Sequence, residues 1–247
     1  MKQTILLTLT LFFFTNTYSQ EENINFQLSF GPTFSVPKTS KLTDSNIYGN
    51  PQIKSSLNIG AFILPSLHYS MNGNTSLDFG LGFYLDRFSI EEKNANVTLE
   101  GNRNVSQIQT PINLNFHLGK NNSYLLGIGG FASFLLSAQE KGESRIDSSG
   151  FLTDVENPTN NPSINNSISQ NYDYDIKNRY NSVSFGAFLQ LKKSVSFSDK
   201  TKGFLLLKVN QYLNALKNND SESTIGSISF KNEKESTTIN LGIGIEL

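Results

Sequence analysis

Few side chains in this 247-residue chain could carry out chemistry beyond hydrogen bonding. The chain has two histidines, His68 and His117, and no cysteine, so thiol nucleophiles, disulfides and cysteine-ligated metals are excluded. A serine hydrolase would need a serine and a carboxylate beside one histidine, and Ser66 and Asp78 are the candidates. The alternative is that both histidines fill and hydrogen-bond one end of a packed interior. We favour this alternative and expect no catalytic residues.

Metal, cofactor and nucleic-acid sites also find little support. Asp173 and Asp175 lack the spacing and the glycine of a calcium-binding loop. The 20 Lys and Arg residues stand against 21 Asp and Glu residues, giving a net charge of −1. Without a basic surplus the chain is a poor match for phosphate backbones. We therefore expect no metal, no cofactor and no nucleic-acid partner.

The elements that must position these residues show a period of two. Apolar and polar residues alternate most cleanly between Ser76 and Asp86, which is the mark of a strand with two different faces. Similar alternation predicts eight strands of about ten residues each, an even number with the length that a tilted membrane-crossing strand needs. They cover residues 26–34, 56–69, 76–86, 107–118, 124–136, 182–191, 204–215 and 238–247. Consecutive apolar residues at Leu205–Leu207 leave the register of the seventh strand open.

The connections between the strands alternate in length. Short turns are expected at residues 71–75, 119–123 and around 198–202, and long polar loops at 36–55, 91–104, 140–180 and 217–236. This alternation is typical of an up-and-down barrel with short periplasmic turns and long external loops. Pro32, Pro65 and Pro111 fall within strands, where we expect bulges or strand margins.

The N-terminus predicts a targeting segment. Lys2 is followed by an apolar run from Ile5 to Phe14, and small residues precede Gln20, the order found in secretory signal peptides. We expect residues 1–19 to be a signal peptide cleaved between Ser19 and Gln20, leaving 20–247 as the barrel domain. The apolar run is too short for a spanning helix, which needs about 20 residues.

The two faces of the strands differ in a way that favours a membrane. One face carries Phe, Leu and Ile, and the other carries Ser, Asn, Gln, Asp and Gly, which suits a polar, tightly packed lumen inside an apolar wall. The lipid-facing prediction comprises Phe79, Leu81, Phe83, Leu114, Ile128, Leu241 and Ile243. The alternative is a soluble lipocalin-like barrel with the apolar face inside.

The charged residues on the polar face predict a plug. We expect His68, Asp78, Asp86, His117, Lys192 and Glu246 to form a lumen polar network. Because an unpaired charge in so narrow a lumen is costly, these groups should pair with one another and leave little or no pore.

The whole pattern resembles a known family. An N-terminal segment ending in Thr17–Gln20 (TYSQ), eight alternating strands, Asn- and Ser-rich loops and a final strand Leu241–Leu247 (LGIGIEL) resemble the PorT-like or "outer membrane protein beta-barrel domain" proteins of Bacteroidetes. The resemblance implies a location in the cell outer membrane and assembly by the outer-membrane insertion machinery. Strands recognised by that machinery usually end in an aromatic residue, whereas this chain ends in Leu247.

The sequence therefore predicts an all-β fold, an eight-stranded antiparallel up-and-down transmembrane β-barrel, with outer-membrane lipid as its surroundings. We expect a non-enzymatic protein whose polar extracellular loops have structural, adhesive or partner-binding roles. The alternatives are an accessory of the type IX secretion or gliding machinery, which the resemblance implies, and an outer-membrane lipid-modifying enzyme.

Overall fold

The computed structural model describes most of the chain after the predicted signal peptide. The described residues are 23–38, 41–43, 52–119, 123–147, 167–198, 201–214, 216–217 and 237–247. The predicted signal peptide 1–19 and its cleavage site at Ser19 and Gln20 lie outside them. Within this part of the chain, no helix is long and apolar enough to cross a membrane.

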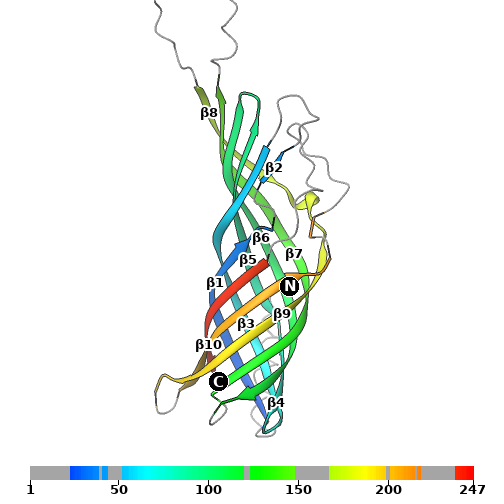
Figure 1. The fold of residues 1–247 in the computed structure, drawn as a ribbon, viewed down its shortest axis with the longest axis vertical. Coiled ribbons are helices and arrows are strands. Elements are labelled where there is room, and N and C mark those ends of the chain that lie inside the picture. The colour runs from blue at the N-terminus through cyan, green and yellow to red at the C-terminus, as the bar shows by residue number, and fades with distance from the viewer. Residues whose placement is uncertain are drawn as a thin grey trace, which may run out of the picture.

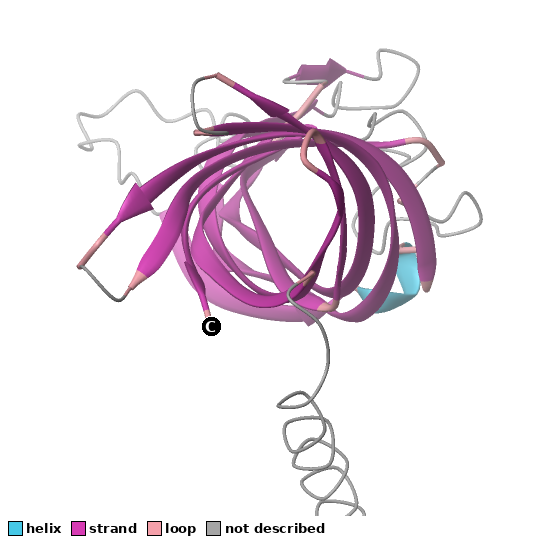
Figure 2. Cartoon of the chain, turned by 90° about the horizontal axis from the view of Figure 1, so that it is seen from below, coloured by secondary structure: helices cyan, strands magenta, loops and turns pink. Residues whose placement is uncertain are grey.

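The structure is one antiparallel sheet that closes on itself, as Figures 1 and 2 show. Its strands are β1 (Ile24–Val36), β2 (Lys41–Thr43), β3 (Gln52–Asn72), β4 (Thr75–Gly80), β5 (Gly82–Asn94), β6 (Val97–Leu118), β7 (Tyr124–Asp147), β8 (Ser167–Asp175), β9 (Val183–Ser196), β10 (Lys202–Tyr212) and β11 (Thr237–Glu246). The ring runs β1, β3, β4 with β5, β6, β7, β9, β10 and β11, and β11 pairs with β1 again. Since β4 and β5 together form one wall, the barrel has the eight walls that the sequence predicts.

Two prolines explain why β4 and β5 are interrupted at Leu81. The register to β6 is the same on both sides of the break, with Phe79 opposite Ile112 and Gly82 opposite Gln109. Pro65 on β3 and Pro111 on β6 flank the break and supply no N–H to the ladder. The sequence predicts a bulge or a strand margin at these prolines; the ends of β4 and β5 lie opposite them, and the register does not shift.

The bulges lie elsewhere, at the far rim of the barrel. β3 has one extra residue between Leu57 and Ala61 relative to β5, and β7 has one extra residue opposite the Ser106–Gln107 step of β6. An extra residue reverses which side chains point inward. Ile53 and Ser55 are therefore buried before the bulge, whereas the even-numbered residues of β3 are buried after it.

Above this rim several strands continue as an open sheet, the projection, which is visible at the top of Figure 1. β6 has 22 residues and β7 has 24, and β8 and β2 join the sheet at its two edges. A strand of 22 residues is about 70 Å long, much more than a belt of about 25 Å requires. The predicted long loop 91–104 is wrong, since β5 and β6 pair up to Asn94 and Val97 and turn tightly between them.

The opposite end of the barrel, the turn end, carries the short connections. Asn72 Oδ1 accepts hydrogen bonds from the backbone N–H groups of Asn74 and Thr75, which fixes the tight turn between β3 and β4. The C-terminal residue also lies at this end, because the Leu247 N–H donates to the carbonyl of Phe26 (Figure 1).

The outer wall of the barrel is apolar and exposed. Phe79, Leu81, Phe83, Ile128, Leu241 and Ile243 are all on this wall and between 38% and 57% exposed, and Leu114 is half-exposed beside them. The large buried side chains face the lumen instead.

Candidate functional site in the barrel lumen

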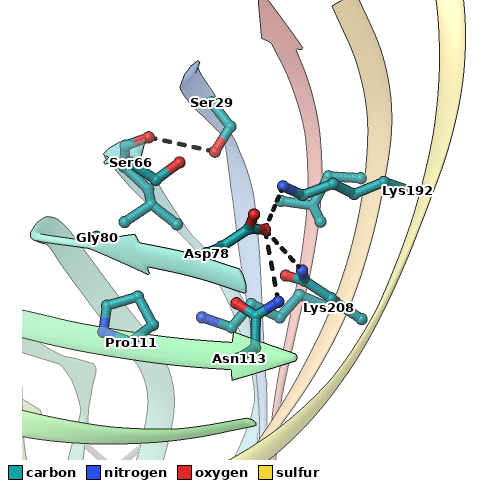
Figure 3. Close-up of a pocket in the computed structure, with 11 residues that line it drawn as sticks. Ser29, Ser66, Asp78, Gly80, Pro111, Asn113, Lys192 and Lys208 are labelled. Atoms are coloured by element: carbon teal, nitrogen blue, oxygen red, sulfur yellow. Dashed lines mark hydrogen bonds and ion pairs between the residues drawn. The ribbon is translucent and has the colours of Figure 1, made fainter. Parts of the chain in front are cut away.

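The half of the lumen nearest the turn end is held by a charged group centred on Asp78. His68 on β3 lies directly opposite Asp78 on β4, and its Nδ1 is 2.6 Å from Asp78 Oδ1. Lys192 reaches across the lumen from β9 and places Nζ 2.7 Å from Asp78 Oδ2 and 2.8 Å from Gln27 Oε1 on β1. Figure 3 shows the two charged side chains meeting over the cavity. The ion pair therefore joins walls that are not neighbours in the sheet.

Amide side chains extend this group around the barrel. Gln190 on β9 donates to Asn115 Oδ1 on β6 at 2.9 Å, and Asn113 donates to the same oxygen at 2.6 Å. Asn113 and Gln190 also lie 3.4 Å from Asp78 Oδ2. A buried polar network is stable only when its members are satisfied, and here each amide has a partner.

The two histidines do not assemble a catalytic triad. His117 Nε2 is 3.0 Å from Ser76 Oγ, whereas the carboxylate of Asp78 contacts His68. The serine and the carboxylate thus belong to different histidines, whose ring centroids are 6.3 Å apart. Ser66, the serine candidate from the sequence, does not hydrogen-bond to either ring, and a triad needs one histidine to bridge both groups.

An apolar layer fills the middle of the lumen. It consists of Phe62, Leu64, Tyr84, Phe204 and Leu206, all at most 7% exposed. The glycines of the C-terminal strand face this layer: a Cβ on Gly242 would lie 2.7 Å from the Phe62 ring, and one on Gly244 would overlap the Phe204 ring. The glycines of the LGIGIEL segment thus leave the space that these two rings occupy.

Lys208 crosses the same layer and is 1% exposed. Its Nζ lies 4.0 Å from the centre of the Phe188 ring and 3.3 Å from Tyr84 Oη, to which it donates. Cation–π contact and the phenol oxygen therefore take the place of a carboxylate at this ammonium.

A second polar layer surrounds Asp86, which is 2% exposed. Gln107 donates to Asp86 Oδ2 at 2.9 Å, and Tyr212 Oη reaches across from β10 to Gln107 Oε1 at 2.9 Å. Ser35 Oγ on β1 also lies 3.4 Å from the carboxylate. Asp86 is thus held by neutral donors and belongs to a different group from Asp78.

At the far mouth of the barrel, a segment that the sequence did not reveal joins an apolar cluster. A short 3-10 helix, η4 (Lys177–Arg179), connects β8 to β9, and the flanking Ile176 and Tyr180 are buried with Phe131 and Leu216 in one apolar cluster. The Ile176 N–H donates to the Ala138 carbonyl, which fixes the segment to β7. Ile176 and Tyr180 lay within a predicted loop, and no local pattern there signals burial.

Above this cluster, Arg103 holds two strands of the projection together. Arg103 Nε is 2.7 Å from Glu140 Oε2 on β7, and one of its terminal nitrogens is 2.9 Å from Glu92 Oε1 on β5. Burial, followed by the charges of Glu140 and Glu92, raises the pKa of the neighbouring Tyr172 phenol.

The lumen network predicted from the sequence therefore differs from the observed one in two respects. The expectation of one group is wrong, because Asp86 stands in a layer of its own, and the half-buried Glu246 on β11 makes no side-chain hydrogen bond or ion pair to any described residue. Phe62 and Phe204 also face the lumen, on the parity that the sequence pattern assigns to polar residues.

Little free space remains between these layers. The enclosed cavity shown in Figure 3 lies between Asp78, Lys192, Lys208 and Pro111 and has a volume of about 10 Å³. That is about the minimum for a single water molecule. In the described part of the chain, no group of three or more Asp, Glu or His side chains could hold a metal ion.

Comparisons with known proteins add similar barrels but no family. No protein-family model matches the chain, and no curated protein sequence does. Similar solved structures include the outer membrane protein OprG from Pseudomonas aeruginosa (TM-score 0.41, 9% identity, 90% of this chain and 95% of that one). Others are the attachment invasion locus protein Ail of Yersinia pestis (0.36, 11%, 92% and 100%) and the outer membrane protease OmpT from Escherichia coli (0.33, 8%, 94% and 97%).

With TM-scores this low, the assignment depends on the barrel itself. A closed sheet leaves no unpaired edge in the hydrocarbon layer, and an exposed apolar wall matches acyl chains. The chain is an integral membrane β-barrel.

Proposed function

We propose that the protein is a non-enzymatic, non-conducting anchor that holds the projection and its connected loops at the cell surface for structural, adhesive or partner-binding roles. The observation that best supports this proposal is the contrast between the barrel and the projection. The lumen is filled by successive polar and apolar layers, whereas the strands of the projection continue far beyond the apolar wall as a sheet with a polar outer face. Strands that extend beyond the apolar wall present polar side chains to partners outside the membrane.

The filled lumen supports the absence of conduction. The Asp78–Lys192 pair, the Phe62 layer and the Ile176 cluster lie one above the other, so an ion would have to pass three separate obstructions. Purified protein in planar bilayers should show no stable single-channel conductance. Stable conductance at neutral pH would contradict the proposal.

The positions of the histidines support the absence of catalysis. Both lie in the lumen near the turn end, and His68 is 6% exposed. An enzyme acting on lipids of the outer leaflet would need its site at the opposite rim, facing the bilayer.

A surface role can be tested by shortening the projection. A variant that joins Ser89 to Asn102 through an Asn-Gly turn removes the tip of the β5–β6 hairpin at paired positions. The matched control inserts the same Asn-Gly pair at Gly73, in the turn between β3 and β4. After cross-linking on whole cells, the shortened variant should lose partners that the native protein and the control retain. Identical partners in all three would contradict the role.

The resemblance to PorT-like proteins supports a second candidate, an accessory of type IX secretion or gliding. Under this proposal the partner is a component of that machinery, and assembly passes through the outer-membrane insertion machinery. Normal secretion of type IX cargo by a deletion strain would exclude it.

A further inference from the structure

The outer side of the projection is a continuous polar face that begins where the apolar wall ends. β6 shows this most simply, because it carries no extra residue: Ile112 and Ile108 on the apolar wall are followed on the same side by Asn104, Asn102 and Glu100. The strand therefore passes from acyl chains into the head-group layer without turning its face away.

Cross-strand register arranges this face in four rows. The first, nearest the apolar wall, is Arg87, Asn104, Gln139 and Asp175; the second is Ser56, Ser89, Asn102, Lys141 and Asp173; the third is Lys54, Glu91, Glu100, Glu143 and Asn171; and the fourth is Gln52, Lys93, Thr98, Arg145 and Ser169. We call these nineteen residues the outer polar face. None of them is apolar, and none is buried.

The charges on this face cancel. Five residues are cationic, namely Arg87, Lys141, Lys54, Lys93 and Arg145, and five are anionic, namely Asp175, Asp173, Glu91, Glu100 and Glu143. Several are paired, as in Lys141–Asp173 at 2.9 Å and Lys93–Glu91 at 2.7 Å. Hydrogen bonds from Lys93 and Lys54 lower the pKa of Glu91, so its carboxylate stays charged at neutral pH. A face without net charge offers hydrogen-bonding groups of both kinds and does not select a ligand by overall charge alone.

The first two rows hold their polar groups in fixed orientations. Arg87 Nε donates to Asn104 Oδ1 at 2.7 Å, and Asn58 on β3 donates to Asn102 Oδ1 at 2.6 Å and to Ser89 Oγ at 3.0 Å. These bonds leave other donors and acceptors of the same amides and guanidinium facing outward. Preorganised planar groups bind hydroxyl-rich ligands with a smaller loss of entropy.

The face is also hollowed. A shallow depression of about 880 Å³ is lined by residues of the second and third rows, including Ser56, Asn102, Glu100 and Lys141. The backbones of Gly101 and Gly142 form part of its lining. The volume falls in the range of small-molecule sites, and the lining combines polar side chains of the face with apolar atoms, among them those of Ile90.

The position of the face identifies what lies against it. Successive rows are about 7 Å apart along a strand, or about 5 Å along the membrane normal at the usual tilt. The first two rows therefore lie in the head-group layer, which is about 5–8 Å thick on each side of the hydrocarbon core. The outer two rows lie above it, at the depth of the saccharide of a surface glycolipid.

We propose that the outer polar face is a binding site for the saccharide head group of glycolipids in the leaflet from which the projection emerges. The site continues the lipid-facing wall, so one glycolipid can place its acyl chains against the Ile108 region and its sugars in the depression. This proposal rests on the barrel lying in the outer membrane with its projection outward.

The test measures which lipids the full-length protein retains. The protein is placed in nanodiscs of phosphatidylethanolamine and phosphatidylglycerol containing either lipopolysaccharide with a full core saccharide or lipid A without core sugars. After extraction and detergent washing, bound glycolipid is counted by mass spectrometry. The native protein should retain lipopolysaccharide in preference to lipid A and to both phospholipids.

Two matched double variants locate the site. Arg87→Ala with Asn102→Ala removes one cation and one polar group from the first two rows and should reduce retained lipopolysaccharide about tenfold, because hydrogen bonds to charged and amide groups are lost. Lys193→Ala with Ser194→Ala removes the same kinds of group from exposed positions at the turn end and should leave retention unchanged. Heat-modifiable gel mobility checks that both variants fold.

Three results would overturn the proposal: equal retention of lipopolysaccharide and lipid A, which indicates phosphate capture; native retention by the Arg87 variant; or a protein cross-linked at the face in place of glycolipid. Failure of the native barrel to enter the nanodisc would instead refute the membrane assignment itself.

Discussion

Replacing Lys192 by methionine should test the lumen group most sharply. Asp78 is 4% exposed, and its Oδ2 is 2.7 Å from Lys192 Nζ, so Lys192→Met leaves a buried carboxylate without its ammonium partner. Breaking a buried pair in this way costs about 3–5 kcal/mol of unfolding free energy. Asp78→Asn should cost less, because Lys192 still donates to Gln27 and the new amide keeps hydrogen-bonding capacity.

The double variant decides whether the pair acts as a unit. Asp78→Asn with Lys192→Met removes both charges, and we expect it to be more stable than Lys192→Met alone, with a coupling energy of at least about 2 kcal/mol. Lys193→Met is the matched control, since this neighbouring lysine is exposed on the outer wall and its replacement should change stability by about 0.5 kcal/mol or less.

Urea unfolding in lipid vesicles provides the measurement. Far-ultraviolet circular dichroism and heat-modifiable gel mobility both report the barrel, and the sequence has no tryptophan that could serve as an intrinsic probe. Additive costs, with a coupling energy below about 0.5 kcal/mol, would refute the reasoning that Asp78 and Lys192 stabilise the barrel as a pair.

Three further predictions concern packing, catalysis and a turn. Gly244→Ala places a methyl group against a phenylalanine ring and should lower the free energy of unfolding by about 1–3 kcal/mol, whereas Gly73→Ala, with open space around it, should have little effect; equal effects would contradict the packing account. Cells carrying His68→Ala and His117→Ala should keep their normal outer-membrane lipid profile by mass spectrometry, and an altered profile would indicate an enzyme. Ala95 has φ of 49°, so Ala95→Gly should stabilise the hairpin by up to about 1 kcal/mol in urea unfolding, and a loss of stability would contradict the assigned turn.

The alternation of apolar and polar residues was enough to predict the barrel because a closed sheet has only two faces. Once Leu81 and Phe83 were assigned outward, Asp78 and Tyr84 had to point inward. Which inward residues would meet depended on the stagger of the strands around the ring, and pattern alone does not contain that information. The sequence therefore predicts that the charged lumen residues pair with one another, but not which residues form each pair. Only the structure shows that Asp78 pairs with Lys192, from walls that are not neighbours.

The errors have physical causes. The sequence predicts a loop where β5 and β6 form a hairpin, because the outer face of the hairpin is polar, although Ile90 and Leu99 alternate inward on it. The part of a strand that lies outside the membrane does not need an apolar outer face. A predicted strand length of about ten residues, which only spans the membrane, is therefore too short for β5 and β6. The Phe62 and Phe204 layer was missed because glycines, here Gly242 and Gly244, create space on the opposite wall without any signal of what fills it.

The central claim is that the apolar side chains of this barrel face acyl chains, whereas the lumen is filled by side chains and excludes lipid. Two adjacent residues of β5 test this claim directly. Because the chain has no tryptophan, Phe83→Trp and Tyr84→Trp each introduce a single fluorophore, the first on the outer wall and the second in the lumen. In vesicles of brominated lipids, we predict strong quenching of the tryptophan at position 83 and little at position 84. Equal quenching, or stronger quenching at position 84, would contradict the account.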